Sequence, residues 1–192
     1  MVAHAVMVGI MSTTPVHLGQ DGHGLEVIGL VISLHILGMY ALSPVFGALA
    51  DRVGPLSVAL GGLVGLGVAA VIAFATPRSL PAVLVALTVL GVGWSASIIS
   101  ASVLLAGVDS GDVRVPLQGA TDALMNYGGA AAALLAGVLL GGVTMSIGML
   151  VHEASVLLVI AIAMLLLRPT LEKDDTAADL PVAQATQEAL TP

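Results

Sequence analysis

Cysteine is absent from the 192-residue sequence, so disulfides, thiolate metal sites and cysteine nucleophiles are excluded. Charged residues are also scarce, at 9% of the chain, whereas soluble domains carry roughly 25%. Because so little charge cannot cover a water-soluble globule, and 58% of the residues are hydrophobic, the composition favours an integral membrane protein over a soluble enzyme. There are 5 basic against 12 acidic residues, and no basic patch indicates a nucleic-acid partner.

The chain contains six apolar stretches, each near the length of about 20 residues that a membrane helix needs. The first is short at its start and lacks the basic start of a signal peptide, so we expect a span whose leading residues are missing. An acidic stretch at the end, poor in large apolar side chains, predicts a disordered tail. The sequence thus predicts an all-α integral membrane protein, with six transmembrane helices over residues 1–168 and a cytoplasmic tail over 169–192. The six predicted spans are approximately 3–18, 26–46, 55–75, 80–105, 117–140 and 148–167.

Basic residues predict the orientation, because the cytoplasmic loops of membrane proteins are enriched in Lys and Arg. Arg52 follows the second span and Arg114 the fourth, while Arg168 and Lys173 follow the sixth. Only Arg78 lies on the opposite side. We therefore expect a multi-pass protein of the plasma membrane with both termini in the cytoplasm.

Glycines within the spans predict close helix packing, because small residues let the backbones of membrane helices approach one another. The chain has 23 glycines. Three pairs have the small-xxx-small spacing: Ser43 with Gly47, Gly61 with Gly65, and Gly137 with Gly141.

The connection between the second and third spans reads GALADRVG over residues 47–54. Gly47 and Gly54 permit a tight turn between antiparallel helices. Asp51 and Arg52 place opposite charges at a helix boundary, where they can pair with neighbouring helix ends. This segment resembles the G-x-L-A-D-R-x-G signature of the major facilitator superfamily, which lies between the second and third helices of each six-helix half. The resemblance implies a 3+3 inverted repeat and makes residues 47–54 a conformational-switch motif.

The resemblance also bears on which half of that fold is present. Many amino-terminal halves carry an arginine in the fourth helix, and antiporters add a proline-containing glycine motif in the fifth. The fourth span here, around Trp94, has no arginine, and the fifth has no proline between Gly128 and Gly142. The chain most resembles the carboxy-terminal half, which implies an amino-terminal half as partner, in the same gene or a separate one.

In this family the first and fourth helices of each half line the central cavity, so the resemblance implies that polar residues on those spans contact the solute. Pro15 would free a backbone carbonyl on the first span, and broken helices often mark transport sites. A hydroxyl can instead bond to a carbonyl of its own helix, and Trp94 can instead pack in the interior. The possible cavity-lining residues are Ser12, Thr13, Thr14, His17, Trp94, Ser95, Ser97 and Ser100.

Three further intramembrane residues are candidates for ion coupling, because polar groups are costly inside a bilayer. They are His35 on the second span and Asp122 and Asn126, four residues apart on the fifth. The alternative for Asp122 is local pairing with Arg114 or a helix terminus. Histidines and carboxylates also gather on the outer side, but no compact ligand spacing predicts a metal site, and no cofactor is expected. That outer group comprises His17, Asp21, His23, Glu26, His152 and Glu153.

The predicted function is therefore membrane transport of a small solute by alternating access, without enzymatic activity. No Walker A sequence is present to drive transport by nucleotide hydrolysis. Two alternatives stay open. One is a truncated or silent membrane partner protein, and the other is a six-helix channel, although the chain lacks paired Asn-Pro-Ala half-helices and a carbonyl-filter sequence.

Overall fold

The computed structural model describes residues 2–76, 78–107 and 111–142, and every regular element within these ranges is an α-helix. Three segments in this part of the chain are long and apolar enough to cross a membrane, which agrees with an all-helical membrane protein. They are Leu25–Val53, Pro55–Ala73 and Leu80–Ala106. The helices are α1 (Val2–Gln20), α2 (Leu25–Tyr40), α3 (Ser43–Val53), α4 (Pro55–Ala75), α5 (Leu80–Ala106) and α6 (Gly111–Gly142).

The predicted spans over 3–18, 55–75 and 80–105 coincide closely with α1, α4 and α5. The predicted fifth span over 117–140 lies within α6, but that helix begins earlier, at Gly111, and includes Arg114 and Pro116. Proline is tolerated there because its fixed φ angle suits a helix and few ladder bonds are lost near the start. The predicted sixth span over 148–167 and the tail over 169–192 lie outside the described residues.

The second predicted span differs more from the structure. It divides into α2 and α3, and residues 47–53, expected in a turn, belong to α3. Pro44 in the first turn favours this helix start, and the Ala-Leu-Ala run that follows consists of strong helix formers. The turn is confined to Gly54, whose φ of 88° suits glycine, and Pro55 begins α4 directly after it.

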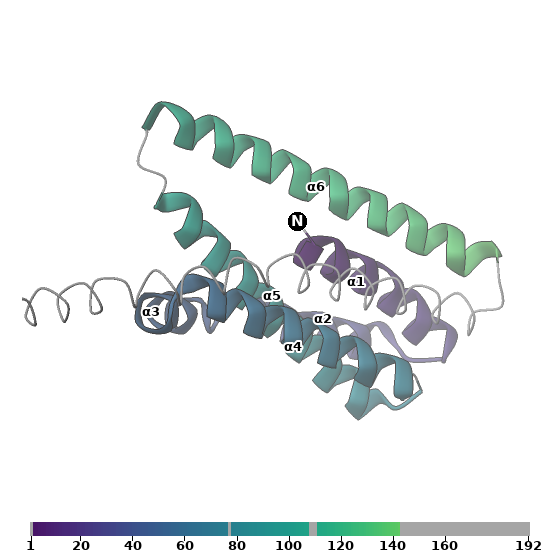
Figure 1. Cartoon of the computed structure of the whole chain (residues 1–192). Coiled ribbons are helices and arrows are strands. Elements are labelled where there is room, and N and C mark those ends of the chain that lie inside the picture. The colour runs from purple at the N-terminus through teal and green to yellow at the C-terminus, as the bar shows by residue number, and fades with distance from the viewer. Residues whose placement is uncertain (1, 77, 108–110, 143–192) are drawn as a thin grey trace, which may run out of the picture.

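Helix α5 occupies the centre of the arrangement (Figure 1). It contacts α4 on one side and α2 and α3 on another, while α1 packs against α6. His35 meets Leu87, and Ser43 at the start of α3 meets Ser95 with the same sequence offset, so α2 runs parallel to α5. Helix α4 runs antiparallel to α5, since the two are joined by a short connection and pack along their lengths.

Two glycines on opposite sides of α5 set the distances to its neighbours. Residues two apart on a helix point about 200° apart, so Gly91 and Gly93 face different helices. A Cβ atom on Gly93 would lie 2.8 Å from the carbonyl oxygen of Gly62 on α4. A Cβ atom on Gly38 of α2 would lie 2.7 Å from the carbonyl oxygen of Thr88, and one on Gly91 would meet the backbone of α2. The chain thus packs three spans backbone against backbone.

The remaining interior is aliphatic. The main buried cluster gathers side chains from α1, α2, α4 and α5, and a smaller cluster of Ala50, Val58 and Ala96 joins α3 to α4 and α5. Leu66 and Leu90 are fully buried between α4 and α5. This core holds the charged end of α3 and the polar residues of α1 and α5 in fixed positions.

Candidate functional site

The charged residues of the 47–54 motif lie on the exposed side of α3. Asp51 and Arg52 are both exposed. Ala50, which directly precedes them, is buried against Val58 and Ala96. Neither Asp51 nor Arg52 forms a hydrogen bond or ion pair with the residues that the structure describes. The helix therefore buries Ala50 and presents two opposite charges outward.

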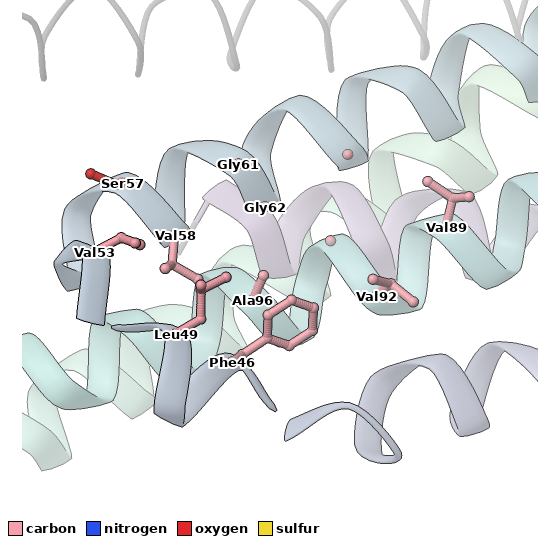
Figure 2. Close-up of a pocket in the computed structure, with 12 residues that line it drawn as sticks. Phe46, Leu49, Val53, Ser57, Val58, Gly61, Gly62, Val89, Val92 and Ala96 are labelled. Atoms are coloured by element: carbon pink, nitrogen blue, oxygen red, sulfur yellow. The ribbon is translucent and has the colours of Figure 1, made fainter. Parts of the chain in front are cut away.

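An apolar pocket of about 240 Å³ lies beside this helix, between α3, α4 and α5 (Figure 2). Ser57 supplies the single polar side chain of its lining. Such a wall can accept an apolar group but offers almost nothing to orient a polar solute. None of the predicted cavity-lining residues contributes to it. The lining consists of Phe46, Leu49, Val53, Ser57, Val58, Gly61, Gly62, Gly65, Val89, Val92, Gly93 and Ala96.

The hydroxyls of α1 bond to their own helix. Ser12 donates to the carbonyl oxygen of Val8 at 2.6 Å, and Thr14 donates to that of Ile10 at 2.8 Å. Thr13 also donates to the carbonyl oxygen of Ile10, at 3.0 Å. Helix α1 continues through Pro15 without a break, so the broken segment expected there is not seen. These three residues remain predictions as cavity-lining groups, and Ser12 is the exposed one among them.

The three predicted cavity-lining serines of α5, Ser95, Ser97 and Ser100, are buried within the bundle. Ser97 donates to the carbonyl oxygen of Gly93 at 2.9 Å, and Ser100 donates to that of Ala96 at 2.7 Å. The hydroxyl of Ser95 lies 3.2 Å from that of Ser43 at the contact between α5 and α3. Their hydrogen-bonding capacity is used between helices or along α5, and their role toward a solute stays a prediction.

Trp94 has a different environment from these serines. Its indole N–H donates to Nδ1 of His4 on α1 at 3.2 Å. The ring centroids of Trp94 and Tyr40 lie 6.4 Å apart in an edge-to-face arrangement. Of these three residues, only Trp94 was predicted from the sequence to be a site residue. The sequence feature that could have indicated His4 is its position as an isolated polar residue in the apolar first turn of a span.

The candidates for ion coupling lie in two separate places. His35 is buried, and its Nδ1 donates to the carbonyl oxygen of Leu87 at 2.8 Å. Its Nε2 is buried without a hydrogen-bond partner among the described residues. Asp122 and Asn126 are exposed on α6, where the side-chain amide of Gln118 donates to the Asp122 carboxylate at 3.0 Å. The Asn126 amide donates to the backbone carbonyl of Asp122.

The outer polar residues that the structure describes form one close pair. His17 Nε2 lies 3.4 Å from a carboxylate oxygen of Asp21, one helical turn later. Within the described part of the chain, no group of three or more His, Asp or Glu side chains could hold a metal ion. His152 and Glu153 lie outside it.

Comparison with known proteins agrees with these features. The sequence model of the Major Facilitator Superfamily matches residues 1–191. Two Bacillus subtilis proteins are described as uncharacterized MFS-type transporters. YdeG is 43% identical over 71% of this chain, and YddS is 39% identical over 72% of it. The riboflavin transporter RfnT of Brucella anthropi is 31% identical over 72% of the chain.

The matched regions make up only 32% of each Bacillus subtilis protein and 34% of the Brucella protein, so this chain aligns with about a third of each relative. The family match extends over nearly the whole chain, and the helices and the GALADRVG segment on α3 agree with it. The chain belongs to the Major Facilitator Superfamily of membrane transporters.

Proposed function

We propose that this chain forms the carboxy-terminal six-helix half of a transporter, built on a 3+3 inverted repeat, that moves a small solute across the plasma membrane by alternating access. It would act with an amino-terminal half, in membrane lipid, with both termini in the cytoplasm and without enzymatic activity. The observation that carries the proposal is the family match over residues 1–191, together with the exposed Asp51–Arg52 pair of its signature segment.

The lack of a partner for Asp51 and Arg52 supports a contact outside the described residues. A carboxylate near a helix amino terminus typically contributes about 0.3–1 kcal/mol, and more when partly buried. That free energy is enough to shift a balanced two-state equilibrium several-fold. In this proposal, Asp51 meets the cytoplasmic end of a helix from the other half and favours the outward-facing state.

The solute and the coupling ion are open to direct tests. Riboflavin is the first solute to examine, because one relative at 31% identity is named a riboflavin transporter. Asp122 is the first coupling candidate, because it is exposed on α6 beside Gln118 and Asn126, whereas His35 is enclosed between α2 and α5. Proton coupling through Asp122 predicts that Asp122→Asn abolishes accumulation driven by a pH gradient while leaving solute exchange intact.

A chimera provides the test of transport. This chain would replace the matching segment of the Bacillus subtilis protein YdeG, and uptake of labelled solutes including riboflavin would be measured in proteoliposomes. We expect saturable uptake by the chimera and none by the isolated chain. Saturable transport by isolated monomers would overturn the need for a second half. Non-saturable flux through the isolated chain would instead indicate a channel, and a chimera that inserts but moves no solute would indicate a silent partner.

A further inference from the structure

His4, Tyr40 and Trp94 form an aromatic cluster in which each residue comes from a different helix: α1, α2 and α5. The centroids of the His4 and Trp94 rings are 6.1 Å apart, and those of Tyr40 and Trp94 are 6.4 Å apart. The whole chain contains only 1 Trp, 2 Tyr and 2 Phe. The only tryptophan and one of the two tyrosines therefore meet at one place, whereas the buried hydrophobic clusters in the described part of the chain consist of non-aromatic side chains.

The aromatic cluster is accessible rather than buried. Tyr40 is 62% exposed, and His4 and Trp94 are each partly buried. Trp94 also lies near the middle of α5, which runs from Leu80 to Ala106. An aromatic surface at that depth is far from the membrane interfaces where Trp and Tyr usually gather. Anchoring at the headgroup level thus does not explain its position.

Hydrogen bonding within the aromatic cluster fixes the proton on His4. An indole N–H can only donate, so His4 Nδ1 is the acceptor, and the neutral imidazole carries its proton on Nε2. Among the described residues, neither His4 Nε2 nor the Tyr40 hydroxyl has a hydrogen-bond partner. The aromatic cluster therefore combines an indole ring oriented by His4 with the hydroxyl of Tyr40.

The position of His4 is set from the opposite side by α6. A Cβ atom on Gly129 would lie 2.9 Å from Cδ2 and 3.1 Å from Nε2 of His4. Only glycine at this position lets the imidazole lie directly against the α6 backbone. Gly129 and Trp94 together hold the ring in place, and such preorganisation reduces the entropy lost on ligand binding.

We propose that the aromatic cluster binds a planar heteroaromatic ring that carries hydrogen-bond acceptors at its edge. The ring would stack on the indole of Trp94, whose N–H is held by His4, and accept a hydrogen bond from the Tyr40 hydroxyl. Aromatic faces attract cations, but the cluster contains no carboxylate to balance a positive charge at membrane depth, so we expect a neutral ring. The inference rests on the proposed transport function, since the ring would belong to the transported solute.

Equilibrium dialysis of the full chain in lipid nanodiscs tests this binding, with empty nanodiscs correcting for partition into lipid. The probes are labelled riboflavin, nicotinamide and xanthine as heteroaromatic rings, ribitol as a ring-free control, and tetraethylammonium as a cation. We expect saturable binding of at least one ring compound and none of ribitol. The proposal is overturned if none of the three ring compounds binds saturably. It is also overturned if tetraethylammonium displaces a labelled ring compound at a lower concentration than the same compound without label does.

Substitutions locate the bound ring. Tyr40→Leu and Trp94→Leu should each raise the Kd roughly two- to tenfold, as loss of an aromatic contact implies. Trp94→Phe should restore part of the affinity because it retains a ring. Tyr127→Leu is the matched control, since Tyr127 is 75% exposed on α6 and outside the aromatic cluster. Equal effects of Tyr40→Leu and Tyr127→Leu would contradict the proposal, and Tyr40 is exposed enough for its replacement to leave the fold intact.

The same variants in the transporting chimera separate this inference from the proposed function. Solute uptake that is unchanged by Tyr40→Leu and Trp94→Leu would overturn the binding site while leaving the transporter proposal in place. Ring binding that responds to the substitutions in a chimera without any transport would support the site and contradict the proposed function.

Discussion

Helices α5 and α6 are the two longest in the described part of the chain, yet they pack in opposite ways. Helix α5 buries ten of its 27 residues. Most described side chains of α6 are exposed, and only Gly129 and Ala136 are buried. Both glycines in the middle of α5 touch neighbouring backbones, whereas Gly119, Gly128 and Gly137 on α6 face open space. Glycine-rich sequence thus marks close packing only where another backbone is within reach.

The largest expected effect comes from filling the contact between α4 and α5. In Gly62→Ala the added Cβ atom would lie 2.6 Å from the carbonyl oxygen of Gly93 and 2.8 Å from the backbone nitrogen of Ser97. Backbone atoms cannot rotate away, so the helices must separate. We expect unfolding in detergent, measured by SDS or heat denaturation, to show a loss of about 3 kcal/mol, the upper part of the usual range for overpacking.

Gly61→Ala is the matched control for this change. Its Cβ atom would meet nothing within 4 Å, so stability should stay the same or rise slightly through better helix propensity. Equal losses from the two substitutions would show that α4 does not pack on α5 through Gly62.

The next largest loss of stability is expected from replacing His35, because its side chain joins α2 to α5. His35→Ala removes a buried side chain and its hydrogen bond to the Leu87 carbonyl, and we expect the unfolding free energy to fall by about 2 kcal/mol. Leu37→Ala on the same helix is the control, since Leu37 is 59% exposed and should cost much less. A smaller loss of unfolding free energy for His35→Ala than for Leu37→Ala would show that His35 does not stabilise the contact between α2 and α5.

Among the α6 glycines whose surroundings the structure describes, only Gly129 should respond to substitution. Gly129→Ala would press on the His4 imidazole, which can move by a few tenths of an ångström, so the expected loss is about 1 kcal/mol. The emission of Trp94, the only tryptophan, should shift because His4 is its hydrogen-bond partner. Gly128→Ala, whose Cβ atom meets nothing within 4 Å, should change neither quantity. A spectral shift in both variants would contradict the specific contact between α6 and His4.

The smallest effect on stability is expected for Asp51→Asn. Asp51 is exposed and has no ion pair among the described residues, so the unfolding free energy of the isolated chain should change by less than about 0.5 kcal/mol. A larger loss in thermal denaturation would reveal a local structural role for the carboxylate.

Sequence patterns predicted the helices over 3–18, 55–75 and 80–105 closely, because length and hydropathy are local properties of each helix. They predicted contacts less well. The Gly61–Gly65 pair was expected to pack, but Gly62 makes the closest approach to α5, while Gly61 faces open space. The spacing of small residues does not reveal which side of a helix meets a neighbour.

In the candidate site, too, local features could be predicted from the sequence and long-range contacts could not. The 47–54 motif was found from its residues, but its placement on α3 depends on helix propensities that outweighed the turn-forming capacity of Gly47. The contact between His4 and Trp94 joins residues 90 positions apart, and no local pattern predicts it.

In the proposed function, the exposed charges of α3 act on a second half of the transporter. The most direct measurement places single cysteines on each membrane side of the chimera, in this naturally cysteine-free segment, and compares their labelling with and without Asp51→Asn. We predict that the substitution increases labelling from the cytoplasmic side, decreases it from the outer side and slows transport. Unchanged labelling on both sides would contradict the switch role and leave Asp51 as an ordinary exposed residue at the end of a helix.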